Sequence, residues 1–199
     1  MNALTQALKQ ADPALLAELE AIYKDLHQHP ELSMQEVRSA GIVAEAMQRY
    51  GYDVTPHVGV TGVVCVMENG AGPTVMLRAD MDALPMAENT GLPYASTITV
   101  RDADGMEVGV AHSCGHDMHV TWMLGAARIL ASNRGAWQGT LIVVFQPGEE
   151  TAEGASAMVS DWGQDRFPKP DIILGQHVMV GPQAPSAIGL ASPCRPATA

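Results

Sequence analysis

The sequence has few cysteines, few basic residues and no long apolar run. Its three cysteines, Cys65, Cys114 and Cys194, are odd in number and far apart, which is typical of reduced thiols and not of a disulfide framework. A special role for a cysteine here is therefore catalytic or metal-binding. The 11 basic residues are scattered and are outnumbered by 22 acidic ones, for a formal net charge of -11. Nucleic acid is excluded as a partner, because phosphate binding depends on clustered Lys and Arg.

Membrane and export signals are also missing from the sequence. No stretch approaches the ~20 consecutive apolar residues of a membrane span, and the first ten residues, MNALTQALKQ, lack the basic flank and apolar core of a signal peptide. We therefore predict no membrane partner and a cytoplasmic location. What is present is 47% hydrophobic content over 199 residues, which can fill the core of a globular protein.

Two helices are predicted in the first quarter of the chain. Apolar residues recur at helical spacing from Pro13 onward, and this helix should end before Pro30. Ser33 and Glu36 form a Ser-x-x-Glu pattern, which predicts a capping box at the start of a second helix that ends at Gly51.

Short apolar runs predict the strands. Helices that alternate with such runs indicate an α/β protein, which we expect to be a three-layer α/β/α sandwich around a mostly parallel mixed sheet, with strands covered on both faces. A third helix should follow the segment HSCGHDMH (112–119), and a short hairpin is expected between 94 and 110 with a turn at 104–105. The predicted strands span 62–67, 74–80, 140–145 and 171–178.

Residues that can bind metal or transfer protons follow the predicted strands. In open α/β sheets, ligands bind beyond the carboxyl ends of the strands, so these side chains should meet at one edge of the sheet. The loop before the third helix should lie at the same edge. The residues concerned are Asp80, Asp82, Cys114, His116, Glu149, Glu150 and His177.

Each of these residues alone also has an ordinary structural explanation. A histidine or aspartate after a strand commonly only caps a turn, and Glu149 and Glu150 could lie on a solvated loop. Two adjacent carboxylates can instead divide the work, one coordinating a cation and the other accepting a proton from water. Gly115 allows a tight turn that directs its two neighbours inward. Together, thiolate, imidazole and carboxylate suit zinc or a similar divalent metal and suit calcium or magnesium poorly. Asp117 and His119 are expected to support the ligands, to lie in the first helical turn or to contact substrate.

The segments LHQHPELSMQE, LRADMDALPM, HSCGHDMH, FQPGEE and GQHV, in this order, resemble a known family. They are similar to the hippurate hydrolase, or N-acyl-amino-acid amidohydrolase, branch of the aminoacylase and carboxypeptidase-G superfamily of metallopeptidases. The resemblance covers roughly residues 15–180. It implies a zinc-peptidase-like fold and hydrolysis of the amide bond of N-acyl amino acids, such as hippurate-like substrates, or of short peptides.

The resemblance also implies a role for each matching residue. Cys114, His116, Glu150 and His177 would be metal ligands, and Glu149 would be the general base. Asp82 would match a catalytic aspartate of the family that supports the ligands, and Asp80 stands where the wider superfamily has a histidine. The implied cofactors are two divalent metal ions, Zn²⁺ or Mn²⁺, with Co²⁺ and Ni²⁺ as further candidates.

Members of the family continue well beyond the segments that match this chain. Residues 1–180 match the N-terminal portion of the catalytic domain, whereas 181–199 form an irregular Pro- and Ala-rich tail without the family pattern. The family's lid and dimerisation domain has no counterpart here, and neither has one further histidine ligand. We therefore expect an incomplete fold, weak metal binding, poor activity of the isolated chain and no family-like homodimer.

Two alternatives to a metal-dependent enzyme stay open. The chain could be a non-catalytic metal-binding fragment derived from such an enzyme, although Glu149 would not be needed for ligation alone. It could also be a cysteine hydrolase in which His116 or His112 activates Cys114, which would leave the acidic pair and His177 without a role. The sequence does not name the acyl group, the amino acid or the native metal.

Overall fold

The computed structural model describes residues 12–101, 104–163 and 166–179. Its helices are α2 (Pro13–Gln28), α3 (Val37–Arg49), α4 (His116–Ser132), α5 (Gly154–Trp162) and a short 3₁₀ helix, η1 (Arg134–Ala136). Its strands are β1 (Asp53–Val58), β2 (Gly62–Asn69), β3 (Thr74–Asp80), β4 (Thr99–Arg101), β5 (Glu107–Gly109), β6 (Gly139–Gln146) and β7 (Ile172–Gly175).

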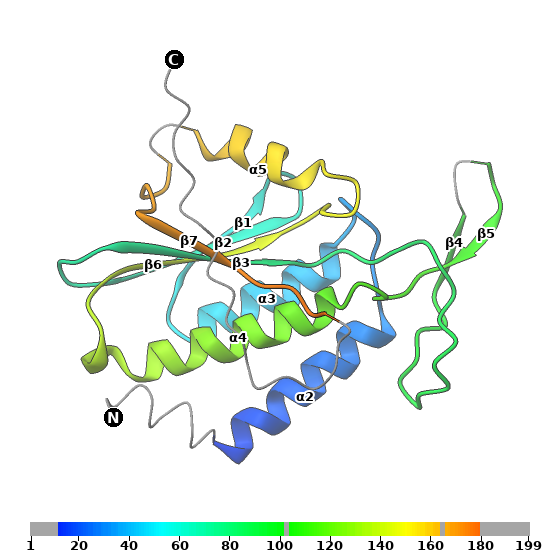
Figure 1. Cartoon of the computed structure of the whole chain (residues 1–199), viewed down its shortest axis with the longest axis horizontal. Coiled ribbons are helices and arrows are strands. Elements are labelled where there is room, and N and C mark those ends of the chain that lie inside the picture. The colour runs from blue at the N-terminus through cyan, green and yellow to red at the C-terminus, as the bar shows by residue number, and fades with distance from the viewer. Residues whose placement is uncertain (1–11, 102–103, 164–165, 180–199) are drawn as a thin grey trace.

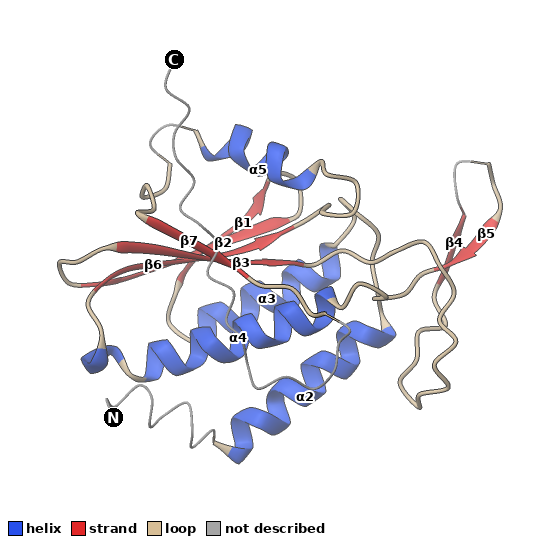
Figure 2. Cartoon of the chain, in the orientation of Figure 1, coloured by secondary structure: helices blue, strands red, loops and turns tan. Residues whose placement is uncertain are grey.

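The central sheet has the strand order β1-β2-β6-β3-β7. Strands β6, β3 and β7 are parallel neighbours, whereas β2 is antiparallel to both β1 and β6. Helices α2, α3 and α4 lie on one face of this sheet and α5 lies on the other (Figures 1 and 2). The prediction of a three-layer α/β/α arrangement around a mixed sheet is confirmed, but the described sheet is not mostly parallel, because two of its four strand pairs are antiparallel. Strands β4 and β5 form the separate antiparallel pair predicted between 94 and 110.

Side-chain alternation along the central strands explains the two helical layers. Successive residues of a strand point to opposite faces of the sheet. In β6, Val143 and Phe145 enter the core beneath α2, α3 and α4, while Ile142 and Val144 enter a smaller core with Met158 of α5. Because β6 is apolar on both faces, it can lie only between two layers.

The first helix has the predicted limits, but the predicted capping box of the second is wrong. Helix α2 ends at Gln28, before Pro30, whereas Glu36 itself occupies the N-cap of α3 and its side chain caps no backbone group of that helix. The Ser33 hydroxyl donates instead to Asp82 over 2.7 Å. Both side chains are used by contacts with distant segments, which a four-residue pattern does not reveal.

The prediction that β7 is covered on both faces is also wrong. Ile172 and Ile173 are about half exposed, at 49% and 50%. Strand β7 lies at the edge of the sheet and pairs with β3 alone among the described strands. Over the same described residues, no helix is both long and apolar enough to cross a membrane.

Candidate metal centre

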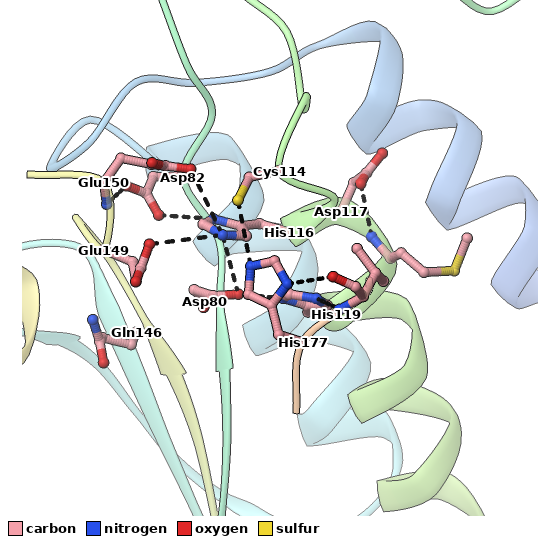
Figure 3. Close-up of polar contacts among 12 residues, drawn as sticks. Asp80, Asp82, Cys114, His116, Asp117, His119, Gln146, Glu149, Glu150 and His177 are labelled. Carbon is pink, nitrogen blue, oxygen red and sulfur yellow. Dashed lines mark hydrogen bonds and ion pairs between the residues drawn. The ribbon is translucent and has the colours of Figure 1, made fainter. Parts of the chain in front are cut away.

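The predicted site residues come together at the carboxyl ends of β3, β6 and β7, beside the start of α4 (Figure 3). Three overlapping groups place their potential ligand atoms within 4.8 Å of one another. These groups are Cys114, His116 and His177; His116, Glu149 and Glu150; and Asp80, His116 and His119.

The turn before α4 carries the thiol and the first imidazole. Gly115 is in the left-handed region, with φ of +80°, and a Cβ atom there would lie 2.6 Å from the Val178 side chain. Glycine is therefore needed both for the backbone conformation and for the close approach of Val178. This turn places the Cys114 sulfur 3.3 Å from Nε2 of His177.

His116 is fully buried and is oriented by Asp82. Its Nδ1–H donates to the Asp82 carboxylate over 3.1 Å, so in the neutral ring the Nε2 lone pair faces the centre of the site. Nε2 has no hydrogen-bond partner among the described residues. It lies 3.8 Å and 3.9 Å from carboxylate oxygens of Glu150 and Glu149. A carboxylate that orients a histidine in this way is a common support of a metal ligand.

Asp82 is held in its ionised form. Burial alone would raise the pKa of this carboxyl, but hydrogen bonds from His116, Ser33 and the Glu150 backbone N–H keep that pKa well below its usual range. The backbone bond is 2.9 Å long. Asp82 thus connects the end of β3, the turn after α2 and the loop after β6.

Glu149 and Glu150 differ in exposure. The Glu149 side chain is 40% exposed and the Glu150 side chain 20%. Oε1 of Glu150 is buried and, within the part of the chain that the structure describes, has no hydrogen-bond partner. Adjacent carboxylates in different surroundings are suited to different tasks, the buried one to ligation and the accessible one to proton transfer.

His177 presents its Nε2 to the same centre. Its Nδ1–H donates to the Val178 carbonyl over 2.6 Å, so Nε2 carries the lone pair. Two imidazole Nε2 atoms, a thiol and the acidic pair therefore face one another, and two of their atoms are buried without a partner. A buried polar atom without a partner in the protein is commonly satisfied by a bound water or ion, and this mixture of sulfur, nitrogen and oxygen donors fits a first-row divalent metal.

Without a cation, the Cys114 side chain is a protonated thiol at neutral pH. Burial raises the pKa of the Cys114 thiol to about 11, and the nearby Glu150, Glu149 and Asp80 carboxylates add to this effect. A divalent cation would reverse the influence of these charges, because a coordinated thiol is deprotonated outright.

Asp80 has partners for both of its oxygens. Oδ1 accepts from His119 over 2.5 Å and Oδ2 accepts from Arg78 over 2.6 Å. Asp80 also lies 3.7 Å from Nε2 of His116. It therefore lies beside the potential ligands and is already engaged by other groups.

The sequence patterns indicated no role for His27 at this centre, and they suggested His112 only as a possible base for Cys114. His27 joins α2 to α4 by a hydrogen bond to Asp117 over 2.6 Å, and it joins α2 to the loop after β3 by a hydrogen bond to Glu88 over 3.1 Å. His112 is buried, and neither of its ring nitrogens has a partner in the described ranges. Burial lowers the pKa of His112 to about 4, so its ring is neutral. His27 lies within LHQHPELSMQE, so membership of a motif was the one available signal.

Comparison with known proteins points to the same family as the motifs. The pattern of the family described as "Peptidase family M20/M25/M40" matches residues 76–191. Hippurate hydrolase from Campylobacter jejuni is 41% identical over 166 residues, which are 83% of this chain and 40% of that protein. N-acetyl-L-cysteine deacetylase from Bacillus subtilis is 35% identical over 181 residues, 88% of this chain and 41% of that protein.

Solved structures share the fold. The Bacillus subtilis YXEP protein, described as a dinuclear metal-binding peptidase of the M20 family, aligns with a TM-score of 0.73 and 34% identity over 84% of this chain and 44% of its own. A Staphylococcus aureus protein described as a putative aminohydrolase aligns with a TM-score of 0.76 and 36% identity, over 90% and 43% of the two chains. The chain thus spans about 40% of the length of hippurate hydrolase and of N-acetyl-L-cysteine deacetylase. On the motifs, the fold and this similarity, the chain belongs to the M20/M25/M40 family of peptidases, as its resemblance to hippurate hydrolases predicted.

Proposed function

We propose that this chain carries the metal centre of an amidohydrolase that uses two divalent ions to hydrolyse N-acyl amino acids. One observation carries the proposal: Nε2 of His116 and Oε1 of Glu150 are buried without a hydrogen-bond partner in the described structure, and the Cys114 and His177 side chains face the same centre. Zn²⁺ and Mn²⁺ are the first candidates, followed by Co²⁺ and Ni²⁺.

Cys114, His116, Glu150 and His177 would hold the ions. When bound, divalent ions polarise the amide carbonyl and lower the pKa of water. Glu149 is the more accessible carboxylate, and we assign it the role of general base: it accepts a proton from the attacking water and passes it to the departing amine as the C–N bond breaks. Asp82 fixes His116 in the tautomer whose Nε2 is free.

The substrate class rests on the relatives. Hippurate hydrolase and N-acetyl-L-cysteine deacetylase are both named for removing an acyl group from an amino acid. We propose a small N-acyl amino acid or a short peptide as the substrate. We also propose that residues 1–180 form the N-terminal portion of the catalytic domain. The described residues leave Glu149 and His177 open to solvent, so we expect the 199-residue chain alone to bind metal weakly and to turn over slowly. A cytoplasmic location stays a prediction.

Metal content and activity should be measured on the same preparations. Elemental analysis after saturation should give two ions per chain, and turnover of N-acetyl and N-benzoyl amino acids should depend on added metal. Glu149→Gln should lower turnover by about 10²- to 10⁴-fold while binding metal normally. Glu153→Gln, four residues further on, is the matched control and should behave like wild type. Fast turnover by the wild-type chain would contradict only the expected weak activity. Turnover that depends neither on added metal nor on Glu149 would refute the proposed function.

A cysteine hydrolase is the second candidate, because Cys114 lies 3.3 Å from a histidine. That histidine is His177, not His116 or His112 as the sequence suggested. The raised pKa of Cys114 opposes this mechanism, since a nucleophilic cysteine needs a lowered one. Turnover that survives a chelator and is abolished by alkylation would support it. Metal binding without any turnover would instead support the non-catalytic fragment.

A further inference from the structure

His119 belongs to a buried group that could hold a metal, yet both of its ring nitrogens are occupied. It is fully buried, as are Asp80 and His116, and the three residues place potential ligand atoms within 4.8 Å of one another. Nδ1 of His119 lies 2.5 Å from Asp80, and Nε2 accepts the Val178 backbone N–H over 2.8 Å. No lone pair of the ring is left for an ion.

These two contacts define the tautomer of His119. A backbone N–H can only donate, so Nε2 must carry the lone pair. The proton is then on Nδ1, from which it donates to the Asp80 carboxylate. Asp80 is held in turn by Arg78, whose guanidinium donates to Oδ2 over 2.6 Å. The ring therefore has a fixed orientation on the first turns of α4, and it presents an acceptor towards the chain that follows β7.

Val178 connects this ring to the proposed ligand His177. Its N–H is bound by His119, and its carbonyl accepts from Nδ1 of His177 over 2.6 Å. The His119 and His177 rings lie edge to face, with centroids 4.6 Å apart. Gly115 makes room for the Val178 side chain. Val178 is thus held at its amide and its carbonyl, and these two contacts orient the adjacent His177 ring. Figure 3 shows the His119 and His177 rings beside each other at the site.

We propose that His119 is a positioning residue that holds the segment after β7 so that Nε2 of His177 faces the metal centre, and that it is not itself a ligand. The inference rests on the proposed function for the ligand role of His177. Strand β7 is a short edge strand of four residues with exposed side chains. The strand alone gives little support to His177, which lies two residues beyond its end.

Two substitutions separate the contacts of His119. The amide of Asn reaches about as far as Nδ1 and can still donate to Asp80, but it leaves the Val178 N–H without an acceptor. The amide of Gln reaches about as far as Nε2 and can still accept from Val178. Both variants replace the same buried ring, so each serves as a control for loss of packing.

Binding of Co²⁺ to the 199-residue chain should be measured by its absorption spectrum and by calorimetry, for wild type, His119→Asn, His119→Gln and His177→Ala. We expect His119→Asn to lower the affinity for one of the two Co²⁺ ions by roughly 10- to 100-fold, the usual effect of losing a group that orients a ligand. The affinities of His119→Gln should stay within a few fold of wild type. Equal affinity of His119→Asn and wild type would overturn the inference. Complete loss of one ion in both variants would overturn it too, because that result identifies a ligand.

A measurement without metal keeps the inference separate from the proposed function. Nitrogen-15 NMR of the metal-free wild-type chain should show His119 with its proton on Nδ1 and a scalar coupling from the Val178 amide to Nε2. A proton on Nε2 would refute the positioning role, whether or not the chain binds ions. If this signature is present and the wild-type chain binds no Co²⁺, the proposed function fails and the contact between His119 and Val178 stands.

Discussion

Removal of the buried Glu36 carboxylate tests how the acidic loop is held in place. Glu36 is fully buried, and one of its oxygens accepts both the Met34 N–H over 2.9 Å and the Gly148 N–H over 2.8 Å. The other oxygen accepts the Thr61 hydroxyl over 2.5 Å. Gly148 directly precedes Glu149, so Glu36 ties the turn after α2 to the loop that carries the proposed base.

The size of the effect follows from these contacts. Glu36→Ala leaves two backbone N–H groups without an acceptor, at about 1–3 kcal/mol each, and opens a small cavity. The expected loss of about 2–6 kcal/mol is a large part of the ~5–15 kcal/mol by which a domain is stable. Glu36→Gln should cost only about 1 kcal/mol, because its amide oxygen can accept both N–H groups and its NH₂ can donate to Thr61.

Glu31→Ala is the matched control. The Glu31 carboxylate also accepts two backbone N–H groups, from Arg38 and Ser39, and the Ser39 hydroxyl, all over 2.8 Å, but these contacts hold only the start of α3. Urea unfolding and Zn²⁺ titration should be compared for the three variants. We expect Glu36→Ala, under conditions where it is folded, to bind Zn²⁺ more weakly than Glu31→Ala. Equal affinities for these two variants, or equal instability of Glu36→Gln and Glu36→Ala, would refute the reasoning.

Gly115, His27 and Cys114 give three further predictions. Gly115→Ala should lower the free energy of unfolding by about 1–3 kcal/mol more than Gly91→Ala does, as measured by thermal unfolding. Both positions have positive φ, but only at Gly115 would the new Cβ overlap a neighbour. Equal losses of stability would contradict the overlap with Val178. Burial lowers the pKa of His27, but the hydrogen bonds to Asp117 and Glu88 raise it by more than burial lowers it, so the pKa is above its usual value. The stabilisation by His27 should therefore be fully present below its unfolded pKa of about 6.5 and should be lost as the pH rises through the folded pKa. Urea unfolding of metal-free wild type and His27→Gln should be measured from pH 6 to 9. A difference in unfolding free energy that stays constant over this range would refute the prediction. A metal at 100 times its Kd should stabilise wild type by about 2.7 kcal/mol and stabilise Cys114→Ser much less; equal rises in Tm would exclude Cys114 as a ligand.

The elements that the sequence predicted are those whose pattern is local. The strands around residues 62–67, 74–80 and 140–145 are continuous apolar runs, and α4 has helical spacing, so each is visible in a short window. Strand β1 was missed because it contains Pro56, which normally argues against a strand. As an edge strand, β1 tolerates this proline. Helix α5 was missed because its nine residues hold few large apolar side chains.

The positions of the site residues were predictable because the strands that carry them have local patterns, whereas the contacts between these residues were not predictable. The carboxyl ends of parallel strands share an edge of the sheet, so the position of each acidic or imidazole group followed from the position of its strand. The contacts of Glu36 could not follow in this way, since it meets Gly148 across 112 positions of sequence. Which carboxylate supports which ligand depends on packing between layers, and no short pattern records it.

The histidines of HSCGHDMH show what residue type and spacing alone do not predict. By residue type, His116 and His119 are equivalent candidates for a metal. The structure distinguishes them by the nitrogen that is free. Nδ1 of each donates to an aspartate, but Nε2 of His116 has no partner in the described chain whereas Nε2 of His119 is occupied by a backbone N–H. A ligand needs a lone pair as well as a position, so the hydrogen bond from Val178 decides which of two neighbouring imidazoles can bind an ion.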